Sequence, residues 1–115
     1  MDIRKEIVVE NIKYPIVFNL NVMESLQNRY GNLKKWIQLI DDRDWDAVDL
    51  SALKYALTLM INEGIDIDNE SLPADEKRPF VTEKQVGRML SHDLINKFNK
   101  TIVESTKIDD PPKNK

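Results

Sequence analysis

The first eighteen residues alternate between apolar and polar positions in two short runs. The apolar residues are Ile3, Ile7 and Val9 in the first run and Ile12, Tyr14, Ile16 and Phe18 in the second. Alternation with a period of two is typical of a half-buried strand. A two-residue turn at Glu10 and Asn11 pairs Val9 with Ile12 and brings both apolar rows to one face. The pattern therefore predicts an antiparallel hairpin over residues 3–18.

Pro15 limits where the second strand lies in a sheet. In this register it is opposite Glu6 in a non-hydrogen-bonded pair, so its missing N–H is directed away from the first strand. Pro15 therefore marks an edge strand. Because a two-stranded ribbon is only marginally stable alone, we expect it to pack against helices or against a strand of another chain.

After residue 20 the apolar period changes to that of amphipathic helices. Asn21, with Glu24 three positions later, fits a capping arrangement, and Gly31 is a natural stop. A second apolar stripe consists of Leu33, Trp36, Ile37 and Ile40. The third helix is expected from about Leu50 to Asn62, with Gly64 as its terminator.

The later part of the chain begins with a predicted surface loop over residues 65–81, which contains Pro73 and Pro79. Thr82 opens "TEKQ", a capping box that starts a helix ending near residue 90. After a break at residues 91–92, a final amphipathic helix is expected to about residue 105. The fold class is therefore α+β and mostly α: a hairpin and about five short helices in a compact bundle. Residues 1–105 form the single predicted domain, and residues 106–115 form a disordered tail.

Composition excludes some classes of partner. The chain has 115 residues, 41% of them apolar, with a net charge of −3. Its basic residues occur in scattered pairs, which argues against phosphate neutralisation and hence against nucleic-acid binding. It contains no cysteine, which suits a reducing cytoplasm. Neither a membrane-spanning run nor a signal-peptide core is present, so no membrane partner is expected.

Acidic residues suggest a calcium loop in "DDRDWDAVD", residues 41–49, where aspartates alternate from 42 to 46. Such a loop needs glycine at its sixth position and glutamate at its twelfth. Those positions hold Ala47 and Leu53, and a loop begun at Asp66 fails the same test. We therefore predict no metal site. Instead, Asp49 caps the following helix, and its acidic neighbours favour the positive end of that helix.

Catalytic chemistry finds no support in the residues. His92 is the single histidine, and no second imidazole or thiol completes a metal or nucleophile site. Three glycines, far apart, cannot form a phosphate-binding loop. We therefore expect neither an enzyme nor a cofactor. Trp45, Tyr55 and Phe80 lie off the main apolar stripes and are candidate partner-binding anchors, although a second core face would explain them equally well.

Three segments resemble the tail assembly chaperones of long-tailed bacteriophages and related prophages. They are "KYPIVFNLNVMESLQNRYGNLKKWIQLI", "DLSALKYALTLMINEG" and "VTEKQVGRML". The shared features are a "YPI-F-LN" strand that runs into a helix ended by "YG", a Leu/Ala-rich helix, and a "T-E-QVG" helix start. The resemblance covers roughly residues 8–105.

The resemblance implies a chaperone in the host cytoplasm that binds the tape-measure protein and keeps it soluble while tube subunits polymerise around it. It also implies that a longer, frameshifted form recruits the tail-tube protein; self-association is a further expectation. Two other classes remain open. One is a structural tail component, which would be found in purified virions. The other is a small DNA-binding or regulatory helical protein, which would bind duplex DNA in a salt-dependent way.

Overall fold

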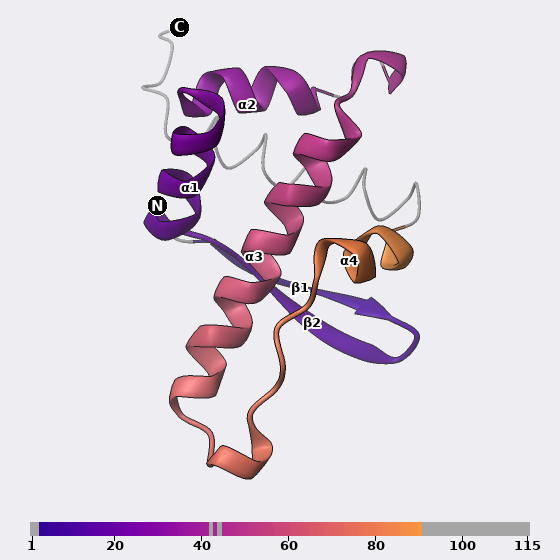
Figure 1. Cartoon of the computed structure of the whole chain (residues 1–115). Helices are drawn as coiled ribbons and strands as arrows, with labels where there is room; N and C mark the ends of the chain where they lie inside the picture. Colours follow the sequence, from indigo (N-terminus) through magenta and orange to yellow (C-terminus); the bar gives the residue numbers. More distant parts are fainter. Residues whose placement is uncertain (1–2, 42, 44, 91–115) are drawn as a thin grey trace, which may run out of the picture.

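The computed structural model describes residues 3–41, 43 and 45–90, in which a hairpin is followed by a mainly helical chain (Figure 1). The strands are β1 (Ile3–Val9) and β2 (Ile12–Phe18), and the α-helices are α1 (Leu20–Tyr30), α2 (Leu33–Ile40), α3 (Leu50–Glu70) and α4 (Glu83–Met89). Two short 3-10 helices are η1 (Trp45–Ala47) and η2 (Ala74–Glu76). The α+β class is therefore confirmed, with four α-helices in the described residues in place of about five. The expected break at 91–92, helix to 105 and tail over 106–115 lie outside the described residues.

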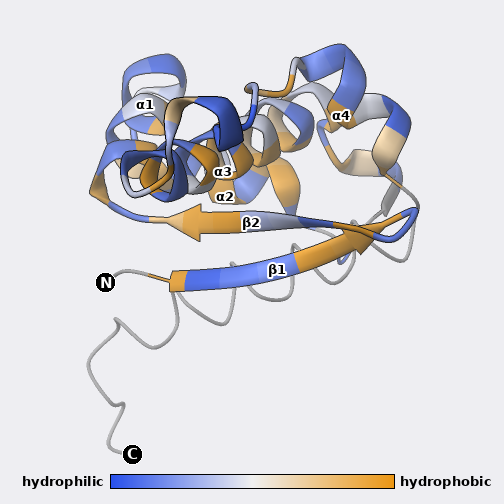
Figure 2. Ribbon diagram, turned by 90° about the horizontal axis from the view of Figure 1, so that it is seen from below, coloured by the Kyte–Doolittle hydropathy of each residue, from blue (hydrophilic) through white to orange (hydrophobic). Residues whose placement is uncertain are grey.

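The hairpin has the predicted register. Val9 pairs with Ile12, Ile7 with Tyr14, and Glu6 with Pro15. Glu10 and Asn11 have φ angles of 51° and 68°. Both turn residues are thus left-handed, as a type I′ hairpin turn requires. β2 lies between β1 and the layer of helices (Figure 2).

The third helix differs most from its prediction. α3 has 21 residues and continues to Glu70, so Gly64 does not terminate it and residues 65–70 are not a loop. Gly64 is buried where α3 crosses β2. A Cβ atom at this position would lie 2.6 Å from Cβ and 2.7 Å from Cγ of Pro15. Glycine is therefore required by the close approach of the helix to the strand, and not by a turn.

Three of the five predicted helix starts and stops are confirmed, and Gly64 is one of the two that are not. Asp49 Oδ1 accepts from the Ala52 N–H at 3.0 Å, and Thr82 and Gln85 form the expected capping box. Gly31, with φ 94°, ends α1. The prediction for the start of α1 was wrong, because the cap is Asn19, whose Oδ1 accepts from the Val22 N–H at 3.2 Å. α1 therefore begins at Leu20, and residue 21 lies in its first turn.

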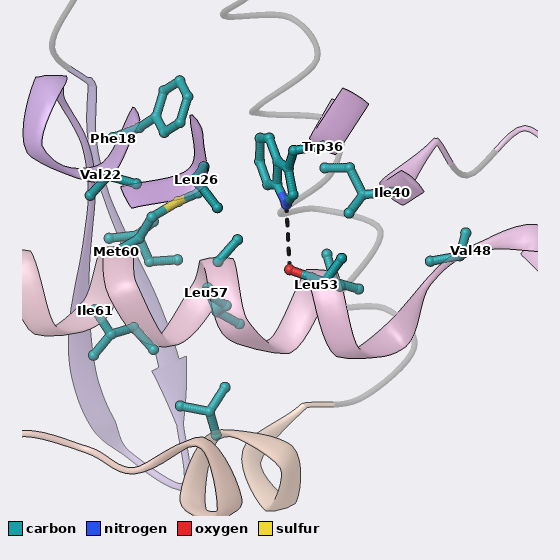
Figure 3. Close-up of a cluster of buried hydrophobic side chains, with 14 of the residues drawn as sticks. Phe18, Val22, Leu26, Trp36, Ile40, Val48, Leu53, Leu57, Met60 and Ile61 are labelled. Carbon is teal, nitrogen blue, oxygen red and sulfur yellow. Dashed lines mark hydrogen bonds between the residues drawn. The ribbon is translucent and has the colours of Figure 1, made fainter. Parts of the chain in front are cut away.

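The core lies between β2 and the helices (Figure 3). Trp36 is fully buried, stacks on Phe18 with ring centroids 6.2 Å apart, and donates from Nε1 to the Ala52 carbonyl at 3.4 Å. Ile40, from the same predicted stripe, is also fully buried. The hydrogen bond satisfies the indole N–H, which would otherwise be costly in an apolar core. α2 is thus anchored on α3 by one large side chain.

Candidate interaction surfaces

The three anchors predicted from the sequence differ in their surroundings. Phe80 is 56% exposed, between η2 and α4. Tyr55 is half-buried: its ring packs edge-on against Tyr30, with centroids 6.2 Å apart, and Cζ of Arg29 lies 4.1 Å from its centroid. The backbone of Trp45 belongs to η1, but its side chain is outside the described set. Tyr55 is therefore part of a packed cluster with α1, whereas Phe80 remains open to solvent.

Phe80 belongs to an extended segment that we call the strap, residues 77–82. The strap returns beside α3 towards α4 (Figure 1). Asn69 donates from Nδ2 to the Arg78 carbonyl and accepts from the Arg78 N–H, both at 2.9 Å. Asn62 makes the same pair of bonds to Val81, at 2.9 and 2.8 Å. Two side-chain amides thus bind the strap backbone as a neighbouring strand would.

The spacing of these two asparagines matches the geometry of the strap. They lie two helical turns apart on one face of α3, a rise of about 10.5 Å. The strap starts at Lys77 with φ −67° and ψ 141°, which is polyproline II geometry. Three residues of such a chain span about 9.3 Å and complete one turn. Arg78 and Val81 therefore present their backbone groups to α3 in phase with Asn69 and Asn62.

Arg78 also ties the strap to the hairpin. Its Nη1 donates to the Lys13 carbonyl at 3.1 Å, and its Cζ lies 5.2 Å from the centroid of the Tyr14 ring. Because Lys13 is a non-hydrogen-bonded position of β2, this carbonyl points away from β1 and needs a partner. The strap is thus held by α3 and by β2, and Phe80 projects from a fixed backbone.

The hollows of the described surface include two grooves. The first, which we call the α1 groove, has a volume of about 390 Å³ and is lined by Leu20, Asn21, Met23, Glu24, Gln27 and Leu33. The second has about 310 Å³ and lies between the start of α3 and the end of α4, where Lys54 and Gly87 face each other. Leu20 is 73% exposed, more than any other large apolar residue described. Sequence reasoning missed it, because the expected helix began two residues later.

Burial and hydrogen bonds shift the pKa of two side chains, and a third group, Glu63, makes polar contacts between helices. Burial raises the pKa of Tyr30, and nearby Asp49 raises it further, while Arg29 opposes both effects. Hydrogen bonds from Arg43 lower the pKa of Asp41, the first residue of the acidic stretch. Glu63 of α3 accepts from Nδ2 of Asn19 and of Asn21, at 2.8 and 2.9 Å. This carboxylate therefore ties the first turn of α1 to α3, where the helix dipole also favours negative charge.

Within residues 3–41, 43 and 45–90, no cluster of histidine, cysteine or carboxylate side chains has the composition to bind a metal ion. In the same residues, no helix has the length and apolar character needed to cross a membrane. No known protein family, curated protein or solved structure matches this chain.

Six large apolar residues are exposed in the described chain: Val8, Ile12, Leu20, Leu50, Ile67 and Phe80. Phe80 was one of the three candidates from the sequence, and its side chain is exposed. The two asparagines that bind the strap were not predicted, because their partners are backbone groups 9 and 19 residues away. In addition, Asn69 belongs to α3 only because the helix continues past Gly64.

Proposed function

We propose that this chain is a tail assembly chaperone of a long-tailed phage or prophage, which binds the tape-measure protein in the host cytoplasm and keeps it soluble. The first support is the family resemblance of three sequence segments. Two of them pack against each other, where Pro15 of "YPI" lies against Gly64 of "INEG" and where Trp36 donates to the Ala52 carbonyl. Residues that resemble the family thus form one structural unit, as expected if they are retained together.

The observation that carries the proposal is the contrast between buried core side chains and exposed apolar side chains. Core residues such as Phe18, Leu26 and Trp36 have no exposed surface. Leu20 and Phe80, in contrast, are 73% and 56% exposed. Exposed aromatic and large aliphatic side chains on a fixed backbone are effective anchors for a protein partner. A protein that covers apolar stripes on a long helical partner requires surfaces of this kind.

The mechanism follows from helix packing. A tape-measure helix exposes an apolar stripe before tube subunits surround it, and such stripes associate with one another in water. Copies of this small domain would bury the stripe in their grooves. Many peptide-binding proteins bind the apolar face of an amphipathic helix in a groove in this way. Each contact is small and reversible, so tube subunits that form a larger interface displace the chaperone.

Co-expression with the tape-measure protein tests this proposal. Fragments of that protein, taken from the same phage genome, should move from the insoluble to the soluble fraction when the full chain is present, and the two should co-purify. A Phe80→Asp/Leu20→Asp double variant should lose this effect while retaining its circular dichroism spectrum. A fragment that stays insoluble with the wild-type chain, or stays soluble with the double variant, refutes the proposal.

Two further measurements address the other classes. A structural tail component would be present in purified virions, whereas we expect a chaperone to be absent from them. A DNA-binding regulator would bind duplex DNA at micromolar concentration with a steep dependence on salt. We expect no such binding, because the basic residues are not concentrated on one stripe.

A further inference from the structure

The α1 groove has an asymmetry that indicates which kind of helix it receives. Leu20, Met23, Glu24 and Gln27 follow one another at the i, i+3, i+4 and i+7 positions of α1, so they line one face over two turns. Leu33, in the first turn of α2, completes the lining. Ridges of this spacing are those into which a second helix packs.

The lining has an apolar inner wall and a polar outer wall. Met23 and Leu33 are partly buried against the hydrophobic core and form the inner wall, while Leu20 is exposed. The outer wall consists of the exposed residues Asn21 and Glu24, and Glu24 alone among the lining residues is charged. The amide of Asn21 donates to Glu63, so a second carboxylate lies next to the outer wall. One wall of the groove is therefore apolar and adaptable, and the other is acidic.

We propose that the α1 groove binds an amphipathic helix that carries an apolar stripe flanked on one side by lysine or arginine. The leucine-like side chains of this helix pack against Met23, Leu33 and Leu20. The flanking cation lies against Glu24 and within the field of Glu63. The match of a negative wall with a basic flank fixes the direction and register of the bound helix, because like charges on that flank would be repelled.

This inference rests on the proposed function for the identity of the natural partner, a helical segment of the tape-measure protein. The chemistry of recognition is testable without that partner. Two synthetic helices with the same leucine stripe, one with a lysine flank and one with a glutamate flank, are the probes. A scrambled lysine peptide of the same composition controls for attraction to the net charge of −3.

Fluorescence anisotropy with the full chain should show saturable binding of the lysine-flanked helix and binding at least about ten-fold weaker for the other two peptides. Leu20→Ala should weaken binding about ten-fold, as expected for an apolar anchor. Val8→Ala is the matched control, because Val8 is also exposed, at 57%, but lies on β1. It should leave binding unchanged.

Glu24→Lys provides the decisive variant. It should reverse the preference, so that the glutamate-flanked helix binds more tightly than the lysine-flanked one. Equal binding of the peptides, an equal effect of Leu20→Ala and Val8→Ala, or an unchanged preference in Glu24→Lys overturns the inference. If these peptides behave as expected but tape-measure fragments stay insoluble, the groove specificity holds and the proposed function fails. If fragments are rescued equally by the Glu24→Lys and wild-type chains, the proposed function holds and the groove specificity fails.

Discussion

Replacing Gly64 with alanine should destabilise the protein, although the same change inside a helix normally stabilises it. Glycine in a helix interior costs up to about 1 kcal/mol relative to alanine. At Gly64 the new methyl group would overlap the Pro15 ring, at 2.6 and 2.7 Å, and would lie 3.3 Å from Cγ2 of Val17. Overpacking of this kind costs about 1–3 kcal/mol, and the rigid ring cannot rotate away. We expect a net loss of about 1–2 kcal/mol.

Urea unfolding followed by far-ultraviolet circular dichroism measures this loss. With a urea m-value of about 1–2 kcal/mol/M for a chain of this size, the midpoint should fall by about 1 M. Gly87→Ala is the matched control, because its Cβ would meet only the Lys54 side chain, at 3.3 Å from Cδ. That flexible chain can move aside, so this variant should be unchanged or more stable by about 0.5–1 kcal/mol.

A second mutation tests the cause. In a Pro15→Gly background both ring atoms are absent, so Gly64→Ala should no longer destabilise. The coupling free energy between the two sites should then be about 1–2 kcal/mol. A Gly64→Ala variant as stable as wild type, or a loss of stability that persists without the Pro15 ring, would show that the helix–strand contact does not restrict this position.

Other predictions concern the strap, the core and alkaline pH. Asn69→Ala removes two hydrogen bonds and should lower the free energy of unfolding by about 1–2 kcal/mol; trypsin should then cleave faster after Lys77, and an unchanged cleavage rate would count against the role given to the amide. Trp36→Phe loses the bond to the Ala52 carbonyl and leaves a cavity, so urea unfolding should show a loss of about 1–3 kcal/mol, while no loss would contradict it. The raised pKa of Tyr30 means that the folded state holds its proton more tightly than the unfolded state. Stability should therefore be complete below the unfolded pKa near 10 and fall as the pH rises through the folded value, and Tyr30→Phe should remove part of that slope in unfolding measured from pH 9 to 11.

Local patterns in the sequence were sufficient where the structure depends on neighbours in the chain. The hairpin register follows from the alternation and from a turn of two residues, and Thr82 with Gln85 form their capping box without help from elsewhere. The cap of Asp49 is equally local. Such elements are correctly predicted because their hydrogen-bond partners lie within a few residues.

The errors come from contacts between distant residues. Gly64 resembles a helix terminator, but the helix passes through it, and glycine is needed there because Pro15 lies so close. Asn19 and Asn21 are both suitable caps. Asn19 is the residue that caps the helix, and Glu63 of α3, 44 and 42 residues away in the sequence, accepts from both side-chain amides. Leu20 was consequently assigned outside the helix, and the α1 groove was not predicted.

The fit of Pro15 on Gly64 also bears on how diverged relatives can be recognised. A larger residue at one position is tolerated only when the other becomes smaller or the helix moves away from the strand. The two positions should therefore change together during evolution, even where the surrounding sequence has drifted beyond detection. A paired proline and glycine at these places in hairpin-plus-helix proteins would be a marker of common descent.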